Sequence, residues 1–126
     1  MKRVLVADDE VGFTTVMKIN LEKQGDYEVE VVNDPFQILA KAREFKPDIL
    51  LLDIMMPGKD GGDVITEMKN DVFLRDLPVL IITALVGSGE TTAGSLVNTP
   101  DGVMLSKPVT ADRLMECIEQ KLAGEI

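Results

Sequence analysis

Side chains that could carry out chemistry follow four short apolar runs in this sequence. Asp8 and Asp9 follow the first run, Asp53 the second and Thr83 the third, and Lys107 stands two residues after the fourth. The runs are Val4–Ala7, Ile49–Leu52, Val79–Ile82 and Val103–Leu105. A cluster of oxygen ligands suits Mg²⁺ or Mn²⁺, whereas a lysine and a hydroxyl suit a phosphoryl group. The set predicts chemistry on a phosphoryl group next to a divalent cation.

Each of these residues also has a plainer interpretation. Asp8 could cap the following helix, Thr83 could simply end a strand, and Lys107 could be a surface lysine. Asp53 is harder to explain in this way, because a carboxylate after four apolar residues is partly desolvated and rarely lacks a partner. Three crowded carboxylates raise one another's pKa unless a cation is present. A carboxylate held beside Mg²⁺ can attack phosphorus, so the order of the whole set favours the chemical interpretation.

Composition excludes several other classes of protein. The chain has 126 residues, the size of one domain, and 45% of them are hydrophobic. Its net charge of −9 disfavours direct binding to nucleic acid. It has no His, which excludes Ser-His-Asp triads and His-ligated zinc. A single cysteine, Cys117, and no apolar stretch of membrane-spanning length predict a cytoplasmic location without membrane association.

Helical patterns alternate with the apolar runs, as in sheets of parallel strands. Val29–Val32 predicts one more strand. Helices are predicted over about Val11–Gln24, from Asp34-Pro35 to about Phe45, over Asp63–Lys69, and after Thr110, as its cap, to about Leu122. We expect Phe36, Leu39 and Ala40 to face inward from the second of these helices. Ligands of such sheets bind beyond the carboxyl ends of the strands, which is where the candidate residues lie.

The segment Leu85–Thr99 fits the alternation poorly. A helix is expected there, but Gly87, Gly89 and Gly94 among Ser and Thr residues favour a short or frayed one after a long loop. The whole pattern predicts a single-domain, doubly wound α/β sandwich.

The combination of motifs resembles the receiver domain of response regulators in two-component phosphorelays. The resemblance covers essentially the whole chain. It rests on Asp8-Asp9, on Asp53 followed by Met56-Pro57-Gly58 and Gly61, on Thr83-Ala84 and on Lys107-Pro108. It implies a (βα)5 fold with a five-stranded parallel sheet in the flavodoxin-like order 2-1-3-4-5. It also implies one receiver domain over residues 1–126, with no effector domain within them.

The resemblance also implies a role for each site residue. Asp53 would be the phosphoacceptor, supplied by a histidine kinase or a histidine phosphotransfer protein. Asp9 and Asp53 would ligate Mg²⁺ directly and Asp8 through water, and the backbone carbonyl of Met55 would complete the protein ligands, with Mn²⁺ as a substitute. Lys107 would bind the phosphoryl group, and Thr83 would turn towards it. The domain would then act on a downstream target or effector domain, and phosphorylation could make it dimerise. It would not be an enzyme beyond phosphorylating and dephosphorylating itself.

The sequence departs from the family pattern at three places. Met104 occupies the switch position that is usually aromatic, so coupling to Thr83 would depend on a flexible side chain. The glycine-rich segment lies where a helix of the output surface belongs. Met55 and Leu85 cannot orient a hydrolytic water, which predicts a long-lived phosphoryl form.

Three alternatives remain at this stage. One is an interaction domain with the same fold that works without phosphorylation. Another is a haloacid-dehalogenase-like phosphatase, which is disfavoured because Met55 stands where a second Asp is needed. A nucleotide- or flavin-binding protein is weaker still, because no phosphate-binding glycine motif follows a strand. The sequence reveals neither the kinase nor the target.

Overall fold

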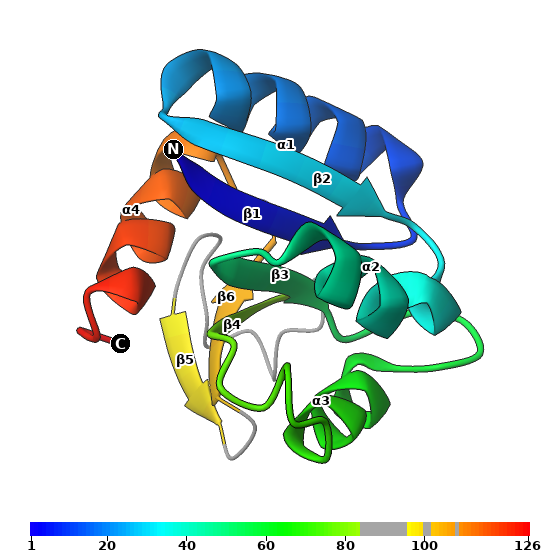
Figure 1. Cartoon of the computed structure of the whole chain (residues 1–126). Coiled ribbons are helices and arrows are strands. Elements are labelled where there is room, and N and C mark those ends of the chain that lie inside the picture. The colour runs from blue at the N-terminus through cyan, green and yellow to red at the C-terminus, as the bar shows by residue number, and fades with distance from the viewer. Residues whose placement is uncertain (84–95, 100–101, 108) are drawn as a thin grey trace.

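The computed structural model describes residues 1–83, 96–99, 102–107 and 109–126. Within them lies a six-stranded sheet in the order β2-β1-β3-β4-β6-β5 (Figure 1). The strands are β1 (Lys2–Ala7), β2 (Tyr27–Val32), β3 (Ile49–Asp53), β4 (Val79–Thr83), β5 (Leu96–Thr99) and β6 (Gly102–Ser106). All except β5 are parallel. The five parallel strands lie in the order β2-β1-β3-β4-β6. Counted among themselves, with β6 as the fifth, they have the predicted order 2-1-3-4-5, so the predicted fold class is confirmed.

The strand β5 was not predicted. It pairs antiparallel with β6 and forms the edge of the sheet. The prediction of a helix in this part of the chain is therefore wrong for residues 96–99, and residues 84–95 lie outside the described part. Pairing with β5 satisfies backbone groups of β6 that an edge strand would otherwise leave open.

Helices cover both faces of the sheet. α1 (Val11–Gln24) and α4 (Ala111–Leu122) pack on one face, and α2 (Ile38–Phe45) and α3 (Gly61–Lys69) pack on the other. Alternate residues of β1 belong to the two cores, with Val4 and Val6 facing one and Leu5 and Ala7 the other. Strand β3 is buried along its whole length, as expected at the centre of a parallel sheet. No helix within the described residues is long and apolar enough to cross a membrane.

The start of the second helix differs from the prediction. Asp34 caps it as expected, since its side chain accepts a hydrogen bond of 2.9 Å from the backbone N–H of Phe36. The first turn, Pro35–Gln37, is however a 3₁₀ turn ahead of α2. A tighter turn shifts the phase of the side chains that follow. Phe36 and Ala40 are exposed, so their predicted inward orientation is wrong, whereas Leu39 is half-buried against the core.

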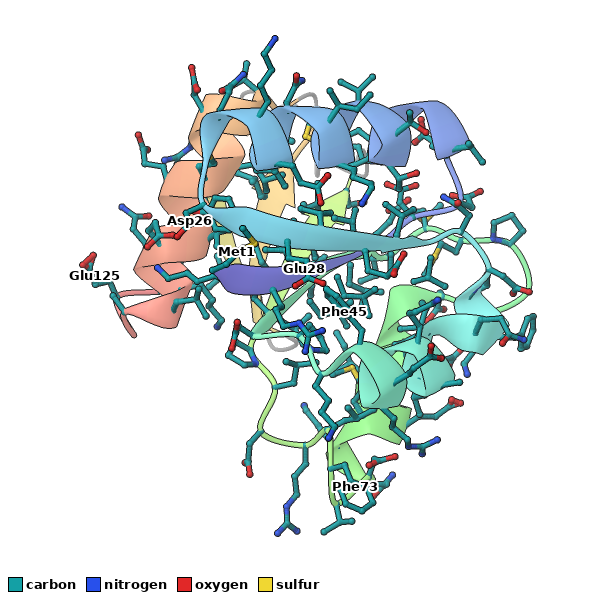
Figure 2. All side chains as sticks on the ribbon, turned by 45° about the horizontal axis from the view of Figure 1, so that its top comes forward. Met1, Asp26, Glu28, Phe45, Phe73 and Glu125 are labelled. Carbon is teal, nitrogen blue, oxygen red and sulfur yellow. The ribbon has the colours of Figure 1, made fainter. Side chains whose placement is uncertain are left out.

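A groove lies at the amino ends of the central strands, opposite the candidate site. Its volume is about 660 Å³, and it lies between the end of α2 and residues 73–78, before strands β3 and β4 begin. Phe73 stands on its rim, is 82% exposed, and projects from the segment that follows α3 (Figure 2). Asp53 and Thr83 lie at the opposite, carboxyl ends of the same strands, so the groove is remote from the candidate site.

Candidate functional site

The candidate site is built on the carboxyl ends of the parallel strands. Asp53 is the last residue of β3 and is buried, and its Oδ1 accepts a hydrogen bond of 3.1 Å from the backbone N–H of Met55. Asp8 follows β1 and is also buried. The Asp8 N–H donates to the carbonyl of Val32 at 3.1 Å, and its carbonyl accepts from the Asn33 amide at 2.8 Å. Asp8 is therefore held by the end of β2 and by Asn33, and Asp53 by the backbone of the loop that follows it.

The loop after Asp53 requires a glycine at position 61. The Gly61 N–H donates to the carbonyl of Ile54 at 2.9 Å, which folds the loop back against the end of β3. A Cβ atom at this position would lie 2.7 Å from the Ile54 Cα and 3.0 Å from the Asp53 carbonyl oxygen. Any larger residue would push on the backbone that carries Asp53.

Lys107 is held by its backbone at the same carboxyl ends of the strands. Its N–H donates to the carbonyl of Thr83 at 2.9 Å. Thr83 ends β4, is buried, and lies in register with Ser106 of β6. Met104 lies earlier on β6, in register with Ile81, and its half-buried side chain packs against the core on the α2 and α3 side.

The Lys107 ammonium lies among three carboxylates. Its Nζ is 2.6 Å from Asp8 Oδ2, 3.0 Å from Glu10 Oε1 and 3.7 Å from Asp53 Oδ2. The side chain of Lys107 is only 10% exposed. Burial lowers its pKa, but the hydrogen bonds to Asp8 and Glu10 and the charge of Asp53 outweigh this effect and raise it. The lysine is therefore charged at neutral pH.

Asp53 is less readily ionised than an ordinary aspartate. Burial, together with the charge of Asp8, raises its pKa to about 6, although the Met55 N–H and the Lys107 ammonium act in the opposite direction. One lysine thus only partly balances the negative charge in the crevice. A divalent cation would lower the cost of ionising Asp53.

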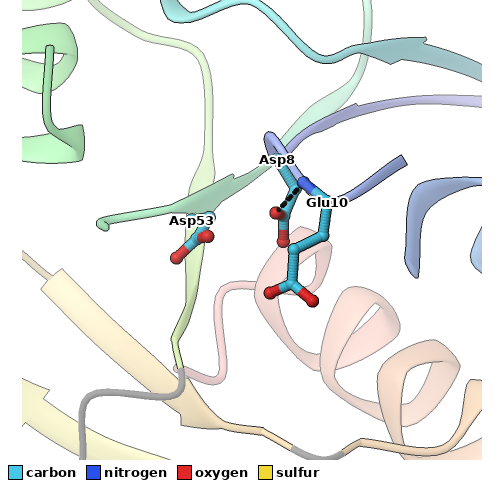
Figure 3. A group of neighbouring side chains, drawn as sticks. All are labelled: Asp8, Glu10 and Asp53. Atoms are coloured by element: carbon cyan, nitrogen blue, oxygen red, sulfur yellow. Dashed lines mark hydrogen bonds between the residues drawn. The ribbon is translucent and has the colours of Figure 1, made fainter. Parts of the chain in front are cut away.

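The structure groups Asp8 and Asp53 with Glu10, and one oxygen from each of these residues lies within 4.8 Å of the others. Figure 3 shows the three side chains near the strand ends; Lys107, which is not drawn there, places its ammonium among them. Oxygen-only ligands suit Mg²⁺ or Mn²⁺, so the residues present fit such an ion. Asp9 is half-buried beside them and is not a member of the group. Its role as a ligand, and that of the Met55 carbonyl, stay predictions.

Sequence reasoning missed Glu10. The signal was present, because Glu10 directly follows the aspartate pair. What the pattern could not show was which of three consecutive acids turns into the crevice.

Comparison with known proteins agrees with this geometry. A family model described as the response regulator receiver domain matches residues 4–119. The chain belongs to this family, whose members are the receiving modules of two-component systems. It is 39% identical over 107 residues to the response regulator PleD of Caulobacter vibrioides, and the aligned region covers 85% of this chain and 23% of PleD. It is 30% identical over 121 residues to the DNA-binding response regulator MtrA of Mycobacterium tuberculosis, and the aligned region covers 96% of this chain and 50% of MtrA. The chain thus spans between about a quarter and a half of the length of these relatives.

Solved structures show the same fold. The receiver domain of the Francisella response regulator 1452 superposes over the full length of both chains, with a TM-score of 0.80 at 23% identity. The N-terminal domain of a response regulator receiver protein from Methanoculleus marisnigri JR1 superposes over 95% of both chains, with a TM-score of 0.68 at 30% identity.

Proposed function

We propose that Asp53 accepts a phosphoryl group from a phosphohistidine on a histidine kinase or a phosphotransfer protein. The observation that carries this proposal is the buried Asp53 carboxylate, with the Lys107 ammonium 3.7 Å from its Oδ2 and the buried Thr83 on the next strand. A carboxylate oxygen of Asp53 bonds to phosphorus while the bond from phosphorus to the donor's imidazole nitrogen breaks, and the imidazole leaves as a neutral ring that keeps the proton already on its other nitrogen. The product is an acyl phosphate on Asp53.

The residues around Asp53 have separate tasks in this proposal. The Lys107 ammonium binds an oxygen of the arriving phosphoryl group. Asp8 and Asp53, with Asp9 and the Met55 carbonyl as further predicted ligands, would hold Mg²⁺ or Mn²⁺. When bound, the cation neutralises charge on the phosphoryl oxygens and so makes attack by a carboxylate easier.

Phosphorylation is proposed to change a protein-interaction surface rather than to start further catalysis. Thr83 turns its hydroxyl towards the phosphoryl group, and Met104, two residues before Ser106 on the adjacent strand, repacks in response. The partner is a downstream protein or an effector domain, and the site of action is the cytoplasm. Relatives such as MtrA are named as DNA-binding regulators, but a domain of charge −9 is itself poorly suited to bind nucleic acid.

The proposal is tested by measuring intact mass after incubation with Mg²⁺ and phosphoramidate or acetyl phosphate. The expected result is one added phosphoryl group in the parent protein and none in the Asp53→Asn variant. A parent that binds Mg²⁺ yet gains no mass would contradict the proposal. That result would favour an interaction domain that works without phosphorylation, for which Met104 in place of an aromatic switch residue is the supporting observation.

A further inference from the structure

The Lys107 ammonium is shared unequally among its carboxylates. It lies within hydrogen-bond distance of Asp8 and Glu10, at 2.6 and 3.0 Å, but is 3.7 Å from Asp53. The ammonium also lies 4.3 Å from the centre of the Phe13 ring, a distance at which a cation is attracted to an aromatic face. Glu10 and Phe13 both come from the start of α1. Together they draw the ammonium towards that helix.

The backbone explains why Glu10 reaches the crevice. The Glu10 N–H donates to Asp8 Oδ1 at 2.9 Å, a local turn in which an aspartate bonds to the residue two positions on (Figure 3). This turn brings the Glu10 carboxylate alongside that of Asp8. The Glu10 side chain is 62% exposed, in contrast to the buried Asp8 and Asp53. Glu10 is therefore a partner that stays largely in water while it holds a buried lysine.

We propose that Glu10 is a positioning residue that holds Lys107 on the α1 side of the crevice, so that the ammonium keeps a carboxylate partner when a divalent cation takes Asp8 Oδ2 from it. This inference rests on the proposed function. A cation bound by Asp8 and Asp53 competes with the ammonium for Asp8 Oδ2. With Glu10 present, Lys107 gives up that oxygen and keeps a counter-charge. Without it, the lysine must either keep Asp8 or remain in a poorly hydrated place with no carboxylate at hydrogen-bond distance.

The inference is tested by a double-mutant cycle on Mg²⁺ affinity, measured by calorimetry on unphosphorylated protein. Glu10→Gln is made in the parent and in a Lys107→Met background, because a cycle isolates the coupling between two residues. In the parent, Glu10→Gln should weaken Mg²⁺ binding about three-fold, which is the scale of a largely exposed ion pair. In the Lys107→Met background the same change should have less than half of this effect in logarithmic terms.

Controls separate this effect from general electrostatics and from unfolding. Glu44→Gln removes one exposed carboxylate on α2 and matches the change in net charge. It should leave Mg²⁺ affinity within the error of the measurement. Circular dichroism melting confirms that each variant is folded. Lys107→Gln replaces Lys107→Met as the background if the methionine variant does not fold.

Three results would overturn the inference. Equal weakening in both backgrounds would show that Glu10 acts on the cation directly, as a ligand or through its charge. An unchanged affinity of Glu10→Gln in the parent would show that Glu10 does not matter for the site. A parent that binds no Mg²⁺ would remove both the inference and the metal-dependent part of the proposed function. By contrast, Mg²⁺ binding without phosphoryl uptake would refute the proposed function, but the double-mutant cycle on Mg²⁺ affinity could still be measured and would still test the role of Glu10.

Discussion

Replacing Asp53 with asparagine should stabilise the protein when divalent cations are absent, and the gain should depend on pH. In the folded protein, burial and the charge of Asp8 raise the pKa of Asp53 to about 6 from an ordinary value of 3.8. A raised carboxyl pKa contributes stability that is fully present below 3.8 and is lost as the pH rises through 6. Above that pH the parent carries the cost of an ionised buried carboxylate, whereas asparagine is neutral at every pH.

The size of the gain follows from the two pKa values. The difference between about 6 and 3.8 corresponds to about 3 kcal/mol of unfolding free energy at pH 7.5. That pKa already includes the attraction of Lys107 at 3.7 Å, so asparagine should recover much of this cost, and the expected gain is about 1–3 kcal/mol. For a domain of this size that corresponds to a rise in melting temperature of roughly 4–10 °C. At pH 4.5 less than half of the gain should remain.

The assay is thermal and urea unfolding in EDTA at pH 4.5 and 7.5, with Asp76→Asn as the control. Asp76 is exposed, so its variant matches the loss of charge without relieving burial. Adding Mg²⁺ should narrow the difference at pH 7.5, because only the parent retains the Asp53 carboxylate for the cation. An Asp53→Asn variant that is no more stable than the parent at pH 7.5 would refute the reasoning. A gain of the same size at both pH values would do so as well.

Three further predictions concern the neighbours of Asp53. Gly61→Ala should destabilise the protein by roughly 1–3 kcal/mol in urea unfolding, because its Cβ would lie 2.7 Å from the Ile54 Cα; an unchanged midpoint would show that the loop yields easily. Lys107→Ala should cost on the order of 3 kcal/mol in EDTA, because it leaves the buried Asp8 carboxylate without its ammonium, and Mg²⁺ should restore part of the loss; equal melting temperatures would count against this account. Phosphorylated protein should keep its phosphoryl group for many minutes with Mg²⁺, because apolar Met55 cannot orient water, and Met55→Asn should shorten that lifetime in a time course of intact mass; a parent half-life of seconds would contradict it.

Much of the fold could be predicted from local sequence because buried parallel strands are continuously apolar. Ile49–Asp53 is buried throughout, and its residue types alone identify it as a central strand. The start of the last helix was equally readable, since the Thr110 side chain accepts the N–H of Arg113 at 3.1 Å, as expected of a cap, whereas α3 begins at Gly61, two residues before the predicted start. These features depend on interactions within a few residues. The strand order 2-1-3-4-5, by contrast, came from the resemblance to receiver domains.

The sequence also determined that three site residues lie at the carboxyl ends of the strands, namely Asp53, Thr83 and Lys107. Each follows an apolar run, and the carboxyl ends of parallel strands share one edge. Residue order alone therefore predicts that Asp53 and Lys107 lie close together.

Only the tertiary structure decided how the charged side chains are arranged at the carboxyl ends of the strands. Three acids in a row, Asp8 to Glu10, give no sign of which ones meet Lys107; the fold brings its ammonium against Asp8 and Glu10, which lie 99 and 97 residues away along the chain. The antiparallel strand at residues 96–99 likewise depends on the open edge of β6, a partner in the sheet that no local pattern describes. The exposure of Phe36, by contrast, has a local cause, the 3₁₀ turn ahead of α2, which the helical pattern of the sequence does not reveal. Local patterns identify the residues that can do chemistry, but partners distant in sequence set which side chains meet, because packing and charge act through space.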